Sequence, residues 1–357
     1  METKVISIII PCRNEERYIT DCINSVKSFS IPEDVKIEIF VIDGESTDNT
    51  KQKVKDLIQE DNRISLINNP GIIQATALNI GIKKARGEYI LRLDAHAIYP
   101  KNYLSLCYES SLKTNAHNVG GLFITQPGGE GYEAKLIQAL TTHKFGVGNA
   151  GFRIGMSEGE ADTVPYGFYR KEIFHKIGYL DERLVRAQDY EFNRRLIKSG
   201  GKIWRDPQIQ ISYFNQPTLK KFLLKQFTLE APYNAYMWFL APYSFAFRHG
   251  ITGIFSLGVV GGISLSFFSS IIKLLFSSVM FIYLCLAIFS AFQQARKYKN
   301  ILHFFILPMC FFSYHFIHGI GLLTGILKLL FNLSPVQKLK EPWSGYGSFR
   351  VRVKKVL

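Results

Sequence analysis

The first half of the chain alternates short apolar runs with longer stretches in which apolar residues recur at helical spacing. The first run, residues 5–10, is followed by residues 14–28, whose apolar positions lie three or four apart. The same order recurs downstream, with apolar runs at 36–42, 63–67 and 88–93 and helical stretches at 49–60 and 71–85. Strands that alternate with helices favour right-handed crossovers and a mostly parallel sheet covered on both faces. The pattern therefore predicts an α/β fold.

Polar residues follow the predicted strands at the points where the strands end. Pro11, Arg13 and Glu15 come directly after the first strand, Asp43 ends the second, and Asp94 follows the fourth. The carboxyl ends of parallel strands meet at one edge of a sheet, and open α/β sheets bind their ligands there. We therefore expect these side chains to line one crevice.

The residues at this edge indicate a cation-dependent ligand. Neither G-x-G-x-x-G nor G-x-x-x-x-G-K-[ST] follows the first strand, which disfavours a dinucleotide-binding domain and a P-loop ATPase. Two acidic groups beside a diphosphate require a divalent cation between them, and Asp94 with His96 offers oxygen and imidazole ligands suited to Mg²⁺ or Mn²⁺. Such a pair alone is more often a strand-end cap, but its position after the fourth strand favours the cation.

The last third of the chain contains three long runs without a formal charge. They cover residues 249–272, 274–295 and 301–327, and Lys273 alone separates the first two. A membrane span needs about 20 apolar residues, so each run is long enough. A tight hairpin broken at Lys273 and a single span followed by a re-entrant piece both fit the first two runs. The third run predicts a further span.

Basic residues predict the orientation of these runs. Three of them, Arg296, Lys297 and Lys299, lie between the second and third runs, where the positive-inside bias places them in the cytosol. The tail, residues 333–357, is also basic, which predicts a cytosolic C-terminus and an even number of crossings. We expect between two and four crossings, and three full spans would conflict with the charge bias.

Residues 217–248 have the pattern of a membrane interface. Apolar positions near helical spacing lie beside lysines, and an aromatic-rich stretch directly precedes the first uncharged run. Aromatic rings of this kind prefer the headgroup level. The other interpretation is a helix packed on its own domain. Cytosolic basic clusters attract anionic lipid, so anionic membrane lipid is an expected partner, although solubility alone would also explain a basic tail.

Composition adds a contrast between the two parts. Of the formal net charge of +14, residues 249–357 carry +10 with a single carboxylate, Glu341, whereas residues 1–248 carry +4, the balance of an ordinary soluble domain. The five cysteines are widely spaced and include no C-x-x-C pair, which indicates neither a disulfide framework nor a zinc site. The first apolar run is too short for a signal sequence, so we expect the N-terminal part to stay in the cytosol.

Several motifs resemble the family 2 glycosyltransferases of GT-A fold. The matching segments are VISIIIPCRNEE, IDGESTDNT, NIGIKKARGEYI and LDAHA, followed by EGEADTVPYGFYRKEIF and IGYLDERLVRAQDYEFNRRLIKSGGKIW. The last two are most similar to the bacterial exopolysaccharide branch, the succinoglycan-type glucosyltransferases. The resemblance covers about residues 4–230. It implies a GT-A Rossmann-like nucleotide-sugar-binding domain, followed here by a C-terminal transmembrane helical segment.

The resemblance also implies roles for particular residues. Pro11, Arg13, Glu15 and Asp43 would border the nucleotide base, with Asp43 accepting from a uracil imide. Asn79 would lie near the donor. Further donor-side roles fall on Asp94, at the ribose or cation, and on His96, at the cation on the diphosphate; the expected cofactor is Mn²⁺ or Mg²⁺.

On the acceptor side, Asp189 falls where the family has its catalytic base. The loop at 152–169, which contains several glycines, is expected to close over the acceptor. Further acceptor-side candidates are Glu158, Asp162, Tyr166, Glu191 and Arg194. A helix N-terminus decorated with acids would also explain Asp189 and Glu191.

The chain departs from the family pattern at four places. His96 replaces the final Asp of D-x-D, which favours Mn²⁺ over Mg²⁺ or weakens metal dependence. Gly44 replaces a second Asp, and Arg13 replaces an aromatic residue, so that a guanidinium would stack on the base. No Q-x-x-R-W motif follows Asp189, which makes a processive polymer synthase less favoured.

The expected activity is transfer of a sugar, with inversion, from a nucleotide sugar to a lipid-linked oligosaccharide in exopolysaccharide or surface-glycan synthesis. The first donor to consider is UDP-glucose. The alternatives are a polyprenyl-phosphate glycosyltransferase and a membrane scaffold or transport protein with an inactive GT-A domain. No nucleic acid partner is expected, and the expected location is the inner cell membrane, multi-pass, with a cytoplasmic catalytic domain. The expected division is a GT-A domain at 1–216, interfacial helices at 217–248, transmembrane helices at 249–332 and a basic tail at 333–357.

Overall fold

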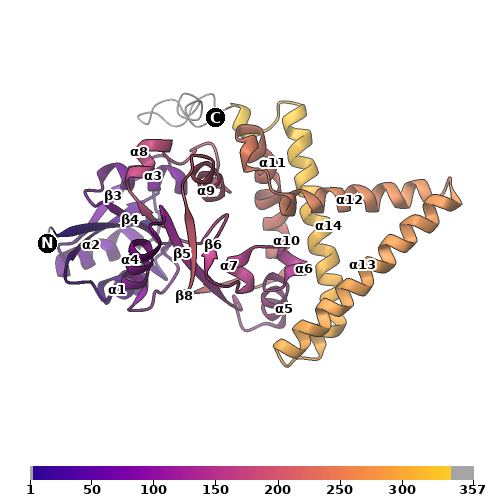
Figure 1. Ribbon diagram of the computed structural model, residues 1–357, viewed down its shortest axis with the longest axis horizontal. Helices are drawn as coiled ribbons and strands as arrows, with labels where there is room; N and C mark the ends of the chain where they lie inside the picture. The colour runs from indigo at the N-terminus through magenta and orange to yellow at the C-terminus, as the bar shows by residue number, and fades with distance from the viewer. Residues whose placement is uncertain (1–2, 339–357) are drawn as a thin grey trace. The chain divides into compact units, whose positions relative to one another are not determined.

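The computed structural model describes residues 3–338, which form two compact units (Figure 1). The first unit comprises residues 3–124 and 155–213, and the second comprises residues 125–154 and 214–338. Each unit has its own hydrophobic clusters. Residues 125–154 thus belong with the C-terminal helices, although they lie inside the range expected for the sheet domain.

The first unit is built on a mixed sheet with the strand order β3-β2-β1-β4-β7-β5-β8-β6. The strands are β1 (Lys4–Cys12), β2 (Val35–Asp43), β3 (Ile64–Asn68), β4 (Tyr89–Arg92), β5 (Asn118–Gln126), β6 (Gly159–Glu160), β7 (Phe168–Arg170) and β8 (Ile203–Phe214). The first four strands are parallel, whereas β7 runs antiparallel to β4 and β5, and β6 antiparallel to β8. The predicted parallel βαβ half is confirmed.

Helices cover both faces of this sheet, which gives three layers. They are α1 (Ile19–Lys27), α2 (Thr50–Glu60), α3 (Gln74–Lys84), α4 (Tyr103–Thr114), α8 (Glu172–Ile177) and α9 (Gln188–Lys198). One hydrophobic cluster joins the sheet to α1, α2 and α4, and the other joins it to α3, α8 and α9. Neighbouring residues of β1, such as Ile8 and Ile9, therefore point into opposite clusters, and both are fully buried.

The first helix begins later than its sequence pattern predicts. The helical spacing starts at residue 14, but α1 begins at Ile19 because the preceding residues form a loop that bonds to the β2–α2 connection. Asn14 has a left-handed backbone with φ of 55°, a conformation that asparagine tolerates better than most residues and that no helix contains.

The second unit is helical. It contains α5 (Tyr132–Thr141), α6 (Lys144–Val147), α7 (Gly151–Ile154), α10 (Leu219–Lys225), the π-helical turn η1 (Gln226–Glu230), α11 (Ala231–Leu240), the 3₁₀ turn η2 (Pro242–Ser244), α12 (Phe247–Ser266), α13 (Ser270–Lys297), α14 (Leu302–Leu330) and α15 (Pro335–Lys338). The segment at 217–248, expected at the membrane interface, comprises α10, η1, α11 and η2. Its helix α11 is mostly buried and packs on α14.

Three helices of the described chain are long and apolar enough to cross a membrane: α12, α13 and α14. Their surfaces carry large exposed apolar side chains, including Phe267, Phe268 and Met309 at 83%, 86% and 74% exposure. A soluble protein rarely leaves such continuous apolar surface in water. The three uncharged runs of the sequence thus correspond to three helices and indicate membrane association.

The break between the first two of these helices lies before Lys273 and not at it. Residues 267–269 form the turn, and Lys273 belongs to the first turns of α13. The turn is set by Ser269, whose side chain accepts a hydrogen bond from the backbone N–H of Ile272 and so caps α13. The expectation about the basic tail concerns mainly residues 339–357, which lie outside the described residues.

The close approach of β5 and β8 provides a stability test of the sheet. A Cβ at Gly121 would overlap the carbonyl oxygen of Ile209. We predict that Gly121→Ala lowers the free energy of unfolding by about 3 kcal/mol or more, because the backbone of β8 must move to admit the methyl group. Gly131→Ala is the control, since nothing lies within 4 Å of the added Cβ. Denaturant titration measures both; equal midpoints would contradict this packing.

Candidate active site

The loops that follow β1 and β2 are tied together. The backbone N–H of Asn14 donates to Ser46 Oγ (2.9 Å), and the N–H of Thr47 donates to Asn14 Oδ1 (2.8 Å). One residue further on, the N–H of Glu15 donates to Thr50 Oγ1 (2.8 Å). These bonds hold the two loops in one conformation, so that they form a fixed rim at the carboxyl edge of the sheet.

Asp43 ends β2 inside this rim. It lies opposite Cys12 in the β1–β2 register, and only 1% of its surface is exposed. Its Oδ2 accepts from the N–H of Ser46 (3.1 Å) and pairs with Lys51 Nζ (3.3 Å). Burial, with the neighbouring Asp43 carboxylate, raises the pKa of the Cys12 thiol, which therefore stays neutral. The Lys51 side chain is 39% exposed and lies between the Asp43 carboxylate and solvent.

The other residues expected at the nucleotide base lie on the same rim. Pro11 is half-buried at the penultimate position of β1, and Arg13 is exposed just beyond the end of the strand. Glu15 Oε1 lies 3.1 Å from His96 Nδ1, and the His96 side chain is 52% exposed. Glu15 thus joins the loop after β1 to the loop after β4, and the strand ends meet as predicted.

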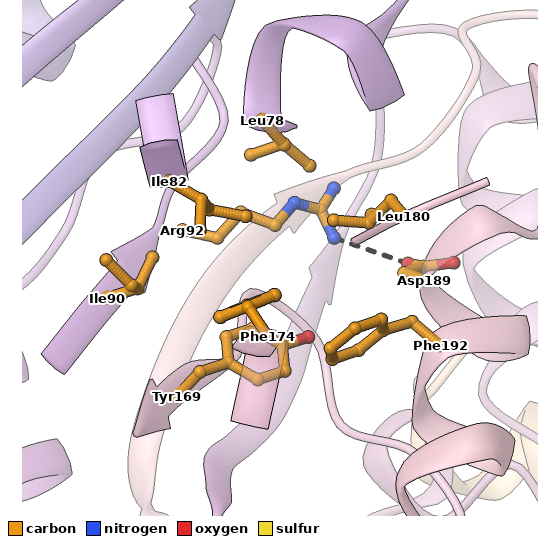
Figure 2. A pocket seen from close by; sticks show the side chains of 9 residues that line it. All are labelled: Leu78, Ile82, Ile90, Arg92, Tyr169, Phe174, Leu180, Asp189 and Phe192. Carbon is orange, nitrogen blue, oxygen red and sulfur yellow. Dashed lines mark hydrogen bonds and ion pairs between the residues drawn. The ribbon is translucent and has the colours of Figure 1, made fainter. Parts of the chain in front are cut away.

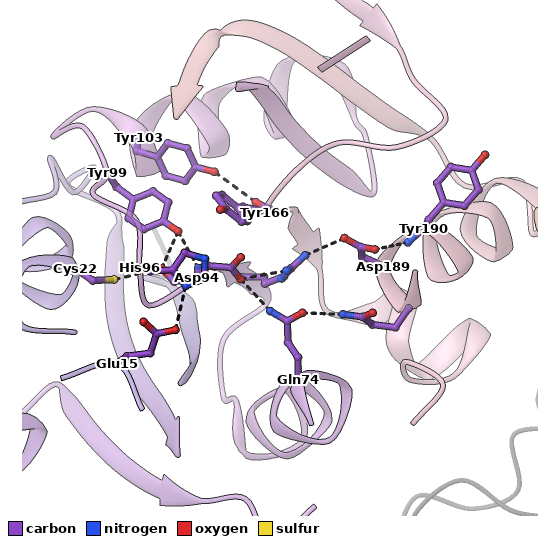
Figure 3. Close-up of polar contacts among 12 residues, drawn as sticks. Glu15, Cys22, Gln74, Asp94, His96, Tyr99, Tyr103, Tyr166, Asp189 and Tyr190 are labelled. Atoms are coloured by element: carbon purple, nitrogen blue, oxygen red, sulfur yellow. Dashed lines mark hydrogen bonds and ion pairs between the residues drawn. The ribbon is translucent and has the colours of Figure 1, made fainter. Parts of the chain in front are cut away.

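Asp94 is the centre of the polar contacts after β4 (Figure 3). Its Oδ1 accepts from Gln74 Nε2 (3.0 Å) and from Arg92 (3.1 Å). The Tyr99 hydroxyl donates to the Asp94 carbonyl (3.2 Å) and accepts from its N–H (2.8 Å). Burial raises the pKa of Tyr99, so its hydroxyl keeps the proton that it donates. The backbone and the carboxylate of Asp94 are therefore both fixed.

Arg92 connects Asp94 to Asp189, and Figure 2 shows its contact with Asp189. Its Nη2 donates to Asp94 Oδ1 (3.1 Å), and its Nη1 donates to Asp189 Oδ2 (3.3 Å). Side-chain exposure is 9% for Arg92, 14% for Asp94 and 39% for Asp189. Burial alone would lower the pKa of the guanidinium, but the two carboxylates more than offset it and the pKa of Arg92 is raised. Arg92 is therefore a permanent positive charge between two acids.

A second link runs in parallel through two amide side chains. Gln188 Nε2 donates to Gln74 Oε1 (2.7 Å), and Gln74 in turn donates to Asp94. Gln188 begins α9 and directly precedes Asp189, whose Oδ1 accepts from the N–H of Tyr190 (2.8 Å). Ala187, just before the helix, is left-handed with φ of 63°, a strained conformation for alanine. The start of α9 is thus held against the loop after β4.

An apolar pocket adjoins this cluster (Figure 2). Arg92 and Asp189 supply its charged groups, and the remaining lining residues are Leu78, Ile82, Ile90, Tyr169, Phe174, Leu180 and Phe192. Charge interactions are stronger beside such a low-dielectric wall than in water. Burial raises the pKa of Tyr169, so no further anion forms there.

Two buried polar atoms of the cluster have no hydrogen-bond partner among the described residues. They are Arg92 Nε and Gln188 Oε1. Leaving such an atom unsatisfied costs about 1–3 kcal/mol, and native structures contain few of them. A hydrogen bond from water or from a bound substrate would offset that cost.

Asn79 has a different environment from the one expected at the donor. It is fully buried, and its amide donates to the Leu180 carbonyl (3.0 Å) and to Glu182 Oε1 (2.8 Å). Its Oδ1 accepts from the N–H of Leu180 (3.0 Å). All its hydrogen-bonding groups therefore hold the loop that leads to α9, and we assign Asn79 to positioning this loop and not to contact with the donor.

Glu191 also differs from the expectation of an acceptor-side role. Glu191 is fully buried and forms a two-pronged ion pair with Arg195, at 3.0 and 2.7 Å. Arg195 also donates to the carbonyl of Ile177 (2.8 Å), so this pair packs α9 against α8. Arg194 is half-buried, and its Nε has no partner among the described residues. Because i and i+4 positions share a helix face, Glu191 points with Arg195 into the core.

The three remaining acceptor-side candidates divide into two groups. Glu158 lies in the exposed segment before β6, where it contacts Lys113 and the Trp204 indole (both 3.3 Å), and no contact links it to Asp189. Asp162 accepts from the Tyr190 hydroxyl (3.3 Å). The Arg92 guanidinium carbon lies 5.6 Å from the centroid of the Tyr166 ring. The backbone of Tyr166 is left-handed, with φ of 44°. Only Asp162 and Tyr166 are therefore tied to the cluster.

Sequence reasoning missed Arg92, Gln74 and Gln188. Arg92 sits two residues before Asp94 in a strand that is otherwise apolar, and this signal could have identified it, since a buried charge needs a partner. The glutamines carry no comparable signal, because amide side chains are common on helix surfaces.

The donor set suits a divalent cation that also binds phosphate. No group of three or more possible metal-ligating side chains occurs among residues 3–338. Asp94 uses Oδ1 for its two hydrogen bonds and offers Oδ2. The exposed His96 lies two residues further along the same loop, and the partly buried Glu15 contacts His96 from the loop after β1. Mg²⁺ and Mn²⁺ are commonly held by one or two protein ligands together with substrate phosphates. The residues present fit such a cation.

Comparisons with known proteins agree with this geometry. Residues 7–178 match the model of the family described as glycosyl transferase family 2. The chain is 27% identical over 339 residues, 90% of its length and 97% of the other, to a Methanococcus voltae protein. That protein is named dolichyl N-acetyl-alpha-D-glucosaminyl phosphate 3-beta-D-2,3-diacetamido-2,3-dideoxy-beta-D-glucuronosyltransferase. The present chain is also 30% identical over 214 residues to the succinoglycan biosynthesis protein ExoA of Rhizobium meliloti. This match covers 59% of the present chain and 64% of the Rhizobium meliloti protein.

A solved structure supports the fold. The mannosyltransferase PcManGT from Pyrobaculum calidifontis, determined with GDP-Man and Mn²⁺, superposes with a TM-score of 0.56 over 94% of this chain and 89% of that one, at 14% identity. At this identity the likeness concerns the fold alone. The sheet is therefore a GT-A-like mixed α/β sheet, and residues 7–178 match a glycosyltransferase family 2 domain.

Proposed function

We propose that this protein is a membrane-attached inverting glycosyltransferase that transfers a sugar, first of all glucose from UDP-glucose, to a lipid-linked oligosaccharide. The observation that carries the proposal is the bridge from Asp94 through Arg92 to Asp189. It places a carboxylate suited to a cation-bound diphosphate beside a carboxylate that is 39% exposed and suited to an incoming hydroxyl.

The donor side comprises Asp43, Asp94 and the rim between them. Asp43 would accept from the uracil imide, and the flexible side chain of Lys51 would yield its place to the base. Asp94 and His96, with phosphate oxygens, would hold Mn²⁺ or Mg²⁺. That cation would neutralise the charge that develops on the departing diphosphate. Arg13 would lie over the base from the exposed rim.

The acceptor side centres on Asp189. A carboxylate that accepts the proton of the attacking hydroxyl contributes about 10²- to 10⁴-fold to the rate. Arg92 and the N–H of Tyr190 would hold this carboxylate in one orientation, and positioning of that kind is a large part of catalysis. Direct displacement by the hydroxyl inverts the anomeric centre, so an α-linked donor gives a β-linked product.

The apolar helices support an acceptor held at a membrane. The Methanococcus voltae relative is named for a dolichyl-phosphate-linked sugar acceptor, and the Rhizobium meliloti relative for succinoglycan biosynthesis. We infer a lipid-linked saccharide as the acceptor class, an inner-membrane location and a cytoplasmic catalytic domain. Exposed Lys220 and Lys221 on α10 would attract anionic lipid.

The enzymatic alternative is transfer to polyprenyl phosphate itself. A phosphate nucleophile needs no strong base, so that reaction would survive the loss of Asp189. A transport function finds less support, because none of the three uncharged runs contains a carboxylate; the basic side chains there are the histidines at 249, 303, 315 and 318, with Lys273 between the first two runs.

Removal of the proposed base gives the first test of the function. Asp189→Asn should lower turnover by about 10²- to 10⁴-fold, because the amide cannot take the proton, while nucleotide affinity stays within about twofold. The exposed Asp56→Asn on α2 is the control. Radiolabelled sugar transfer and calorimetric binding measure the two quantities. Full turnover by Asp189→Asn would exclude its role and favour the polyprenyl-phosphate alternative.

A panel of nucleotide sugars tests the donor and the cation. With Mn²⁺, the correct donor at 100 times its Kd should stabilise the protein by about 2.7 kcal/mol, which a thermal-unfolding assay detects. Chelation of the cation, or the substitution His96→Ala, should remove most of this shift. A shift that persists after chelation would contradict the proposed cation site, and a preference for guanine nucleotides would contradict the assignment of Asp43.

Substitution of Arg92 tests the bridge. Arg92→Met should lower turnover by about 100-fold, because a displacement of Asp189 by about 1 Å is enough for such a loss. Arg92→Lys should retain more activity, although a single ammonium cannot bond two carboxylates as the guanidinium does. The control is Arg63→Met, which breaks a 2.7 Å ion pair with Asp61 that contacts no residue of the Asp94–Arg92–Asp189 bridge. Wild-type turnover in folded Arg92→Met would refute the bridge.

A further inference from the structure

Helices α5, α6, α10 and α11 and the turn η1 of the second unit cover one side of α14 along most of its length (Figure 1). Near its start, the His303 ring lies 5.7 Å from the ring of Tyr132 on α5. Further along, Phe311 packs on Phe145 of α6 at 5.2 Å. These contacts make the first half of α14 part of the same packed body as α5 and α6.

The second half of α14 is covered in the same way. Tyr314 packs on Phe222 of α10, with ring centroids 5.5 Å apart. A Cβ at Gly321 would lie 2.8 Å from the carbonyl oxygen of Phe227 in η1, and one at Gly325 would lie 2.8 Å from Pro232 in α11. From residue 303 to residue 325 a helix rises about 33 Å, which is more than the hydrocarbon core of a bilayer, about 30 Å.

The covering helices carry charges that do not tolerate the bilayer interior. Lys220 and Lys221 are exposed on α10 directly before Phe222, whose ring contacts Tyr314 at the middle of α14. Exposed Glu133 and Lys135 lie on α5. If α14 crossed the membrane, α10 would be drawn to the centre of the hydrocarbon, where exposed lysines are strongly unfavourable.

The hairpin of α12 and α13 has the opposite character. Its base is polar: Thr252 Oγ1 bonds His318 Nδ1 of α14 (2.9 Å), and Gln293 bonds His143 (2.8 Å). Its tip is apolar and uncovered, with Phe267 and Phe268 at 83% and 86% exposure. In Figure 1 the two helices project from the side of α14 opposite to α10 and α11. This surface fits a lipid bilayer.

The charges of the hairpin match the thickness of a bilayer. The 20 residues of α12 extend about 30 Å, the thickness of the hydrocarbon core. In α13, Lys273 near the tip and Arg296 at the base are separated by about 35 Å of uncharged helix. The half of α13 nearer its base also packs along α14, where the Tyr283 hydroxyl contacts His315 (2.8 Å), so the length of α13 that crosses lipid is shorter than this separation. Lys273 lies beyond that contact, near the tip, and Arg296 lies on the cytosolic side of it.

We propose that α12 and α13 form a transmembrane hairpin whereas α14 lies in the plane of the cytosolic headgroup layer, so that the described helices cross the bilayer twice. The outer face of α14, with Phe305, Met309 and Leu330 at 66%, 74% and 71% exposure, contacts lipid, and its inner face binds α5, α6, α10 and α11. Two crossings return the chain to the cytosol, in agreement with the even number that the basic residues predict. The proposal is independent of the sugar-transfer reaction.

Single cysteines in the full-length chain locate each segment. The background is Cys285→Ser, because Cys285 is exposed and the other four cysteines are buried. Phe268→Cys probes the tip, Ile301→Cys probes the α13–α14 turn, and Leu333→Cys probes the end of α14; these side chains are 86%, 68% and 62% exposed. A membrane-impermeant maleimide is applied to spheroplasts and to inverted vesicles.

The proposal predicts labelling of Phe268→Cys in spheroplasts only, and of Ile301→Cys and Leu333→Cys in inverted vesicles only. Labelling of Leu333→Cys in spheroplasts would show that α14 crosses and would overturn the proposal. A tip that is not labelled in spheroplasts would overturn it as well. Phe267→Cys and Phe331→Cys repeat the test should a first variant fail to fold. Release of the unsubstituted protein by carbonate as a soluble oligomer would show that a second copy, and not lipid, covers the apolar face.

Discussion

A positive charge held between two carboxylates organises the candidate site. Arg92 is nearly buried, and a buried guanidinium without partners would cost several kcal/mol. Its stability therefore depends on Asp94 and Asp189 remaining close on either side of it. The reverse also holds, because two neighbouring carboxylates repel each other without the cation between them. The loop after β4 and the start of α9, which are about 95 residues apart in the chain, are thereby fixed to one another.

The surrounding structure serves this constraint. The amide pair of Gln74 and Gln188 repeats the link, and Asn79 anchors the loop that delivers α9. The ion pair of Glu191 with Arg195 fixes the inner face of the same helix. Charge in a low-dielectric medium also governs the second unit, since exposed lysines on α10 and uncharged surfaces on the α12–α13 hairpin require different surroundings. The same physical rule therefore shapes both units.

Much of the fold could be predicted because its signals are local. The β1–β4 strands are short apolar runs, and the acids at their ends follow from the geometry of parallel sheets. The environments of Asn79 and Glu191 could not be predicted, because they depend on where the loop at 178–187 and the helix α8 pack. The grouping of residues 125–154 with α14 is likewise a long-range packing result. The turn at residues 267–269 was missed because the Ser269 cap decides it and the charge of Lys273 does not.

The most direct measurement is an experimental structure of the protein with Mn²⁺ or Mg²⁺ and an unreactive analogue of the donor. The account predicts a cation about 2.1 Å from an Asp94 oxygen and from diphosphate oxygens, with the Asp189 carboxylate facing the anomeric carbon from the side opposite the leaving group. A nucleotide bound away from Asp43 and Asp94, or an Asp189 carboxylate turned away from the sugar, would contradict it.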